Sequence, residues 1–122
     1  IIEEVRREKG INPREISKKE ILSRLHGALI NEGTRILEEG HALRASDIDV
    51  CYINGYGFPS HRGGPMWQAD KIGLDKITQE IDSHRNADDL SWPKSNLLNE
   101  LKQSNKSIGS YVPDTTNPKK RN

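Results

Sequence analysis

Apolar residues recur every three or four positions between residues 21 and 39, which is the spacing that gives a helix one apolar face. Ser17 and Glu20 precede this run as a capping box, in which each side chain satisfies a free backbone N–H, and Gly40 follows it as a stop signal. We therefore predict that residues 21–39 form the longest helix and that its apolar stripe faces the core. The stripe consists of Leu22, Leu25, Leu29, Gly33 and Ile36, broadened by Ile21, Ala28 and Leu37.

Gly33 lies in the middle of this stripe. Glycine in a helix interior costs about 1 kcal/mol of stability relative to alanine, so its presence calls for a reason. We expect a neighbouring element to approach the helix closely here, because a residue without a side chain leaves room for it.

Five shorter segments carry helical signals of the same kind. They are residues 1–9, 46–54, 65–72, 74–84 and a stretch around Leu97, Leu98 and Leu101. The first ends at Gly10, which suits a left-handed C-cap, and the third starts with Pro65, whose missing N–H is not needed at a first helical position. Residues 86–91 are expected to form a loop, with Trp92 as an anchor before the last helix.

Residues 46–54 have an apolar content that would also fit a β-strand. Ser46 is a plausible N-cap, and Asp47 and Asp49 would complement the positive end of a helix dipole in the first turn. Gly55 is a natural terminator. These signals favour a helix.

The pattern as a whole predicts an all-α fold. We assign residues 1–105 to one helical domain and residues 106–122, which turn to Ser, Thr, Asn, Pro and Lys, to a flexible C-terminal tail. The chain does not begin with methionine, which suggests a piece of a longer protein.

Charge and composition exclude several classes of function. Nineteen Lys and Arg stand against eighteen Asp and Glu, a net charge of +1, so we expect no nucleic-acid partner. No stretch approaches the ~20 apolar residues of a membrane span.

Cys51 is the single cysteine, which excludes an internal disulfide and a cysteine-based zinc site. Its neighbours predict a small buried hydrophobe.

A glycine-rich segment, INGYGFPSHRGGP, follows at residues 53–65. Gly55 and Gly57 fit the start of a dinucleotide-binding fingerprint, but Ser60 takes the place of the third glycine, and no βαβ pattern surrounds it. A nucleotide cradle is therefore disfavoured.

Arg62 offers a second interpretation of the same segment. Together with backbone N–H groups at a helix N-terminus, it could hold an anion such as phosphate. We favour a structural role, in which Arg62 pairs with a local carboxylate such as Asp70 and the glycines permit a sharp reversal between two helices.

Candidate catalytic side chains do not form a complete set. Ser23 and His26 share a helix face as a nucleophile and base would, but no third group or oxyanion turn accompanies them. The histidines have no metal-ligand spacing, and we expect each to face solvent; they are His26, His41, His61 and His84.

Residues 29–77 resemble the C-terminal helical domain of L-3-hydroxyacyl-CoA dehydrogenases. The resemblance rests on Asn31-Glu32-Gly33, SDID at residues 46–49, GYGFP at 55–59, RGGP at 62–65 and AD…GLD ending at Asp75. More narrowly, the segment resembles the last such domain of multifunctional β-oxidation enzymes that join enoyl-CoA hydratase to the dehydrogenase. The resemblance extends over about residues 1–109 and implies the fold of the 6-phosphogluconate/3-hydroxyacyl-CoA dehydrogenase C-terminal type.

This resemblance implies that NAD and the catalytic histidine with its glutamate belong to a separate Rossmann domain outside this chain. No cofactor or metal is then expected on the chain itself. The family places an asparagine near the reacting thioester, and Ser23 holds that place here. We infer a second, non-catalytic helical repeat that packs on the first repeat and is inactive alone.

The resemblance also marks candidate substrate-binding or interface residues. They are Asn54, Tyr56, Phe58, Arg62, Gly63 and Gly64. We expect the helix over residues 21–39 and the corner over residues 55–65 to form an interface with the Rossmann and first helical domains of the parent chain, whose substrate would be 3-hydroxyacyl-CoA. In a free fragment the same surface could form a homodimer.

A rival interpretation is a free-standing helical module that binds a protein or a phosphorylated ligand through its loop and basic tail. The C-terminal residues Lys-Arg-Asn do not form a Ser-Lys-Leu peroxisomal address, so a bacterial cytoplasm is the expected location, with a peroxisome or a mitochondrion as the alternatives.

Overall fold

The computed structural model describes residues 1–88 and 93–113, with the side chains of residues 85–88 excepted. In this part of the chain there are six α-helices and two 3₁₀ turns, and no strand. They are α1 (Ile2–Glu8), α2 (Lys18–Glu38), α3 (Ala45–Gly55), η1 (Ser60–Arg62), α4 (Pro65–Ile72), α5 (Leu74–Asp88), α6 (Asn96–Gln103) and η2 (Ile108–Ser110). The prediction of an all-α fold is confirmed.

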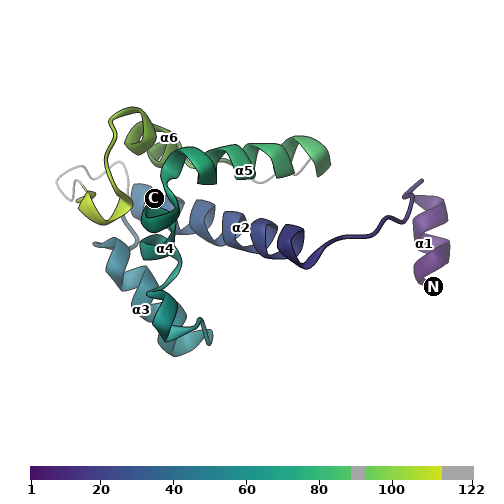
Figure 1. Ribbon diagram of the computed structural model, residues 1–122, viewed down its shortest axis with the longest axis horizontal. Coiled ribbons are helices and arrows are strands. Elements are labelled where there is room, and N and C mark those ends of the chain that lie inside the picture. The colour runs from purple at the N-terminus through teal and green to yellow at the C-terminus, as the bar shows by residue number, and fades with distance from the viewer. Residues whose placement is uncertain (89–92, 114–122) are drawn as a thin grey trace.

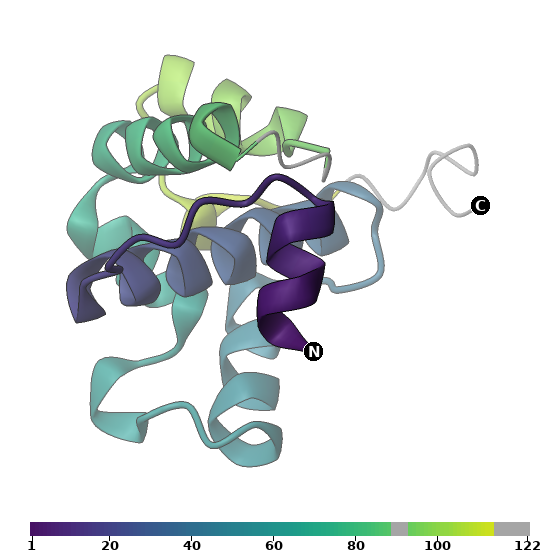
Figure 2. The ribbon, with the colours of Figure 1, turned by 90° about the vertical axis from the view of Figure 1, so that its right-hand side faces the viewer.

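Helix α2 is the centre of the arrangement. It lies beside α5 and also contacts α3, α4 and α6, while α3 and α4 form a second layer at one end (Figure 1). Figure 1 shows helix α1 apart from the helical layers, at the other end of an extended linker, and in Figure 2 this helix faces the viewer in front of them. None of its residues is buried.

The core lies between α2 and the helices that follow it. Its buried apolar members are Ile30, Leu37, Ala45, Ile48, Met66, Ala69, Leu74, Ile77, Ile81, Leu97, Leu98, Leu101 and Ile108. They come from every described α-helix except α1 and from η2, so these elements share one core.

The buried face of α2 differs from the predicted stripe. It consists of Gly27, Ile30, Asn31, Gly33, Thr34 and Leu37. Gly33 and Leu37 were expected inside, but Leu22 and Leu25 are 53% and 57% exposed, so the prediction that the whole stripe faces the core is wrong. Because Asn31 is polar, the periodic pattern of apolar residues does not identify the face of α2 that packs in the core.

Asn31 is tolerated inside because its hydrogen bonds are satisfied. Its Nδ2 donates to the Pro93 carbonyl over 2.9 Å, and its Oδ1 accepts from the Ser95 N–H over 3.0 Å. Ser95 then caps α6, since its Oγ accepts from the Leu98 N–H. A buried amide on α2 therefore fixes the start of α6.

The expectation of a close approach at Gly33 is confirmed. A β-carbon there would lie 2.5 Å from Cε and 2.9 Å from Sδ of Met66, the first buried residue after Pro65 in α4. Both Gly33 and Met66 are buried. The glycine lets α4 pack directly on the α2 backbone.

Helix ends agree with the predicted signals in most places. Ser17 caps α2 through the Glu20 N–H, but the Glu20 carboxylate binds Arg14 and Arg24 instead of completing the capping box. Gly10 ends α1 with a φ of +62°, and Gly40 follows α2 with a φ of +75°.

The predicted start of α3 is off by one residue. The helix begins at Ala45 with Arg44 as N-cap, because the Asp47 carboxylate accepts from the Arg44 N–H and closes the first turn there. Ser46 is thus inside the helix, although the assignment of residues 46–54 to a helix is correct.

Later boundaries also shift. Helix α5 continues to Asp88, so a loop over residues 86–91 is wrong for residues 86–88, while residues 89–91 and Trp92 lie outside the described residues.

Ile108 is fully buried in the shared core. A domain end at residue 105 stays a prediction, and this contact favours a later end; residues 114–122 of the predicted tail are not described.

Candidate functional site

One side of α2 carries apolar side chains that no other described element covers. We call it the outward face, defined by Ile21, Leu22, Leu25 and Ala28, all exposed. At 100° per residue, Leu25 points about 140° away from Ile30, which is in the core. Helix α2 is therefore apolar on two opposed sides, as helices enclosed between two partners are.

The glycine-rich corner at residues 55–65 reverses the chain between α3 and α4. Gly57, Gly63 and Gly64 all have positive φ angles, of +69°, +75° and +95°. A β-carbon on Gly63 would lie 2.8 Å from the Trp67 ring, and one on Gly64 would overlap the Asp49 carboxyl group. The corner needs these glycines for its shape, as the structural interpretation expected.

Asp49 reaches from α3 to the N-terminus of α4. Its Oδ1 accepts from the Met66 N–H over 2.7 Å, and its Oδ2 accepts from the Trp67 N–H over 3.1 Å. Burial raises the pKa of Asp49, and the two N–H groups oppose that rise. The expected role of Asp49 in the first turn of its own helix is wrong, because its side chain caps the next helix.

This cap bears on the anion-site interpretation of the corner. Helix α4 starts with Pro65, which has no N–H, and the next two N–H groups already bind Asp49. Gln68 donates to the Gly64 carbonyl. A phosphate at this helix end would have to displace a buried carboxylate, so the geometry does not support such a site.

Arg62 does not form the expected pair with Asp70. Asp70 instead accepts hydrogen bonds from the backbone N–H groups of Ile108 and Gly109, over 2.7 and 2.9 Å, which holds η2 against α4. Among the ion pairs of the described residues, none involves Arg62. Its charge acts on His26 instead.

His26 joins the corner to α2. Its ring centroid lies 6.1 Å from that of Phe58, and its imidazole is half-buried. Burial lowers the pKa of His26, the positive charge of Arg62 lowers it further, and Glu80 acts in the opposite direction. Phe58 and Arg62, two of the predicted site residues, thus come together beside α2.

The other predicted site residues lie elsewhere in the corner. Asn54 is exposed and donates to the Val50 carbonyl within α3. Tyr56 is 79% exposed, with its ring centroid 5.2 Å from that of Tyr52. Gly63 and Gly64 have the packing roles described above, so only Phe58 and Arg62 approach His26 together.

A polar cluster between α2 and α5 was not foreseen from the sequence. The Ser23 hydroxyl donates to Glu80 Oε2 over 2.8 Å, and its Oγ lies 2.9 Å from His84 Nε2. A cavity of about 390 Å³ adjoins these groups. Spacing on one helix pairs Ser23 with His26, whereas the fold pairs it with residues some sixty positions later, a contact that carries no local signal.

The cluster lacks the order of a hydrolase triad. In a triad the histidine accepts the serine proton and a carboxylate orients the histidine. Here Ser23 donates directly to Glu80, so the carboxylate and the imidazole both meet the hydroxyl. The arrangement ties α2 to α5.

The remaining expectations concern the exposure of the histidines and of Cys51, a metal site and a membrane-spanning segment. His41 and His61 are exposed as expected, but His26 and His84 are half-buried, since each packs in a contact between elements. Cys51 is exposed, so the prediction of a buried residue is wrong. No group of three metal-ligating side chains occurs in the described residues. No described helix is long and apolar enough to cross a membrane.

Comparison with known proteins places the chain in a family. Residues 21–109 match the family model of the 3-hydroxyacyl-CoA dehydrogenase C-terminal domain. The peroxisomal bifunctional enzyme of Danio rerio is 45% identical over 71% of this chain and 12% of its own length, and that of Homo sapiens is 43% identical over 75% and 13%. A glyoxysomal fatty acid β-oxidation multifunctional protein of Cucumis sativus is 35% identical over 66% of the chain and 12% of its own length.

The chain thus spans about an eighth of the length of these relatives. Their names refer to peroxisomes and glyoxysomes, so the expectation of a bacterial cytoplasm is wrong. The family model covers the outward face, the corner and the Ser23 cluster together. The chain belongs to the family of 3-hydroxyacyl-CoA dehydrogenase C-terminal domains.

Proposed function

We propose that the chain is a non-catalytic helical domain of an NAD-dependent 3-hydroxyacyl-CoA dehydrogenase of fatty acid β-oxidation. Its role is to brace the catalytic part of that enzyme, which comprises a Rossmann domain and a first helical domain. The relatives support this proposal, because they are bifunctional or multifunctional enzymes in which such a domain is a small share of the whole.

The outward face of α2 is the observation that carries the proposal. Three of its side chains, Ile21, Leu22 and Leu25, are 45%, 53% and 57% exposed on the central helix of the domain. Exposed apolar patches on otherwise well-packed domains mark interaction sites. A neighbouring domain seated there would bury the second apolar side of α2.

The corner extends this surface. His26 follows Leu22 by four residues and precedes Leu29 by three, so it shares a side of α2 with them. Phe58 and Arg62 lie beside His26. We infer that Phe58 and Arg62 contact the neighbouring domain. Asn54 and Tyr56 are further candidates for contact with that domain or with the acyl-CoA substrate. Gly63 and Gly64 determine the shape of the corner.

In the parent enzyme, oxidation of 3-hydroxyacyl-CoA to 3-ketoacyl-CoA passes a hydride to NAD while a histidine removes the hydroxyl proton. We infer that both groups belong to the parent's other domains. This chain contributes Ser23 at the family's asparagine position, and its hydroxyl is occupied by Glu80. The isolated chain is therefore expected to be inactive with acetoacetyl-CoA and NADH.

A complementation experiment tests the proposal. A parent enzyme shortened by this domain should have low activity and thermal stability, and the separate 122-residue chain should restore both. Leu25→Asp should abolish the rescue because it places a charge in the apolar contact, whereas Val112→Asp, at an exposed apolar residue outside α2, should not. Rescue by Leu25→Asp as good as by the unaltered chain would refute the docking role.

The free-standing module remains the other interpretation. It gains no support from the corner, because Asp49 already occupies the N–H groups that a phosphorylated ligand would use there. Dehydrogenase activity of the isolated chain would exclude both interpretations.

A further inference from the structure

The linker between α1 and α2 borders an open cavity with an unusual lining. Its volume is about 330 Å³, at the lower end of the range for small-molecule sites. Three arginines from three different segments line it: Arg6 in α1, Arg14 in the linker and Arg24 in α2. No aspartate or glutamate is among its lining residues, but the Glu20 carboxylate beside it pairs with Arg14 and Arg24 and partly neutralises the three arginine charges.

Glu20 holds two of the arginines in place from beside the cavity. Its two carboxylate oxygens accept from the two terminal nitrogens of Arg14, and its Oε1 also accepts from Nε of Arg24 over 2.9 Å. The hydrogen bonds from Arg14 and Arg24 lower the pKa of Glu20 to about 2, so the carboxylate stays charged at physiological pH. One anion thereby orients two guanidinium groups, each of which has five N–H donors.

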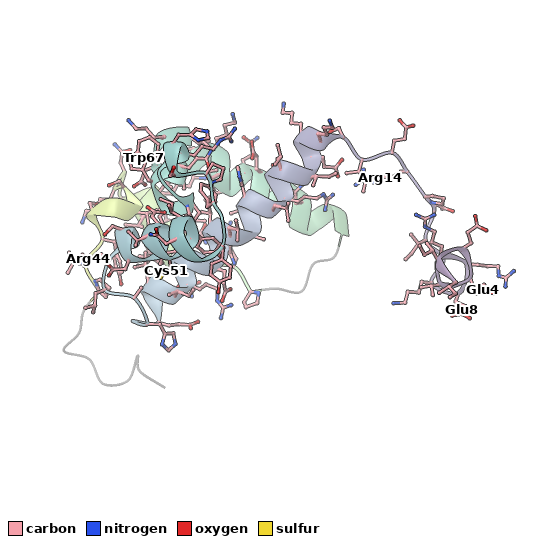
Figure 3. All side chains as sticks on the ribbon, turned by 90° about the horizontal axis from the view of Figure 1, so that it is seen from below. Glu4, Glu8, Arg14, Arg44, Cys51 and Trp67 are labelled. Carbon is pink, nitrogen blue, oxygen red and sulfur yellow. The ribbon has the colours of Figure 1, made fainter. Side chains whose placement is uncertain are left out.

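A helix-ending motif positions the third arginine. The Gly10 N–H donates to the Arg7 carbonyl, and the Ile11 N–H donates to the Arg6 carbonyl, which together form a Schellman motif. This motif turns the linker back along the end of α1 and places Arg6 and Ile11 on the same cavity. In Figure 3, Arg14 extends from the linker between α1 and the main helical layers.

Three apolar residues and the polar residue Asn12 complete the lining. Ile11, Pro13 and Ile16 face the same space as the arginines. Guanidinium groups recognise phosphate through paired N–H donors, and an apolar wall suits a planar or carbon-rich body attached to it. We propose that this cavity is a binding site for a phosphate ester with such a body, the chemical class of a nucleoside diphosphate.

This site does not depend on the outward face of α2. The outward face is apolar and suits a protein surface, whereas the cavity is lined by three arginines and has a volume that suits a small ligand. A loss of docking between domains would therefore leave ligand binding by this chain unchanged.

Calorimetry and amide NMR on the 122-residue chain test the proposal with ADP as the probe. ADP should bind saturably and shift the amide signals of residues 6–16, adenosine should not, and binding should weaken as salt screens the charges. Loss of one charge-assisted contact should weaken binding about tenfold or more in Arg6→Met. Arg7→Met, on the same helix but outside the cavity lining, is the matched control.

Three results would overturn the assignment. They are equal binding of adenosine and ADP, equal weakening by Arg7→Met and Arg6→Met, and binding of a glutamate-rich peptide as tight as that of ADP. The last would mean that the arginines serve carboxylates of a protein partner. Circular dichroism of each variant shows whether the helices are intact, so that lost binding is not lost folding.

Discussion

Both sides of α2 carry large apolar residues, but the structure covers only one of them. The inner side, with Ile30 and Leu37, is 1% and 0% exposed and packs on α4, α5 and α6. On the outward face, Leu22 and Leu25 are more than half exposed. Periodicity finds apolar faces, but it does not tell which face the domain covers itself and which it leaves for a neighbour.

The difference teaches how a small domain can be built for docking. Its own core needs only one side of α2, and there it accepts buried polar residues such as Asn31 and Thr34 because their hydrogen bonds are satisfied. The outward face, with Ile21, Leu22, Leu25 and Ala28, is left exposed. A domain with this distribution of residues gains stability when a partner covers it.

Truncation of one leucine on each side should show the largest contrast. Leu37→Ala should lower the free energy of unfolding by about 2–5 kcal/mol, since it leaves a cavity in the core. Leu25→Ala in the same chain should stay within about 0.5 kcal/mol, because its side chain is already in water. Urea unfolding of the two variants measures both values, and similar losses would mean that the two sides are not distinct.

Helix α3 offers a second contrast of the same kind between Asp49, turned inward, and Asp47, turned outward. Asp49→Ala should cost about 1–2 kcal/mol, because it leaves two N–H groups of α4 without an acceptor. Asp47→Ala should cost less, near 0.5 kcal/mol, since its N-cap contact with Arg44 is exposed to water. Thermal unfolding under identical conditions ranks them, and the reverse order would contradict the role given to Asp49.

Self-association should depend on the outward face alone. If the free chain forms a dimer, the most exposed apolar side of α2 is the expected contact, and Leu25→Asp should weaken dimerisation by about tenfold or more. Sedimentation at several concentrations measures this, with Val112→Asp as the control. A chain that stays monomeric at high concentration would remove the homodimer proposal but not docking to the parent enzyme.

The smallest expected effect is a shift in the pKa of His26, which lies at the edge between the two sides of α2. Its NMR titration should show a pKa below 6.5, and Arg62→Met should raise that pKa without bringing it back to 6.5, because burial is the larger cause. Since the folded pKa is lowered, stability from neutral His26 is present above pH 6.5 and falls as the pH drops through the folded pKa. Arg44→Met, remote from His26, should leave the titration unchanged; an unaltered midpoint in Arg62→Met would contradict the placement of Arg62.

The sequence predicted features that depend on neighbours along the chain. The cap at Ser17, the stop at Gly10 and the close approach at Gly33 all follow from local rules on backbone and side-chain geometry. The exposed state of Cys51 was missed because one helix position is inside or outside only relative to a packed partner.

The candidate site was less predictable for a physical reason. The pairs Asn31 with Ser95 and Ser23 with Glu80 join segments 64 and 57 residues apart. Such contacts depend on which helices pack together, and no periodic pattern carries that information. Phe58 and Arg62 were named through a motif resemblance, and their meeting at His26 followed only from the fold.

Thiol labelling at residue 25 tests the docking account most directly. In a Cys51→Ser background, Leu25→Cys should react rapidly with a maleimide in the isolated chain, because this position is exposed. In the proposed parent enzyme the same thiol should react far more slowly, since the neighbouring domains would cover it. Equal rates in the two proteins would show that the outward face of α2 remains in solvent and would contradict the account.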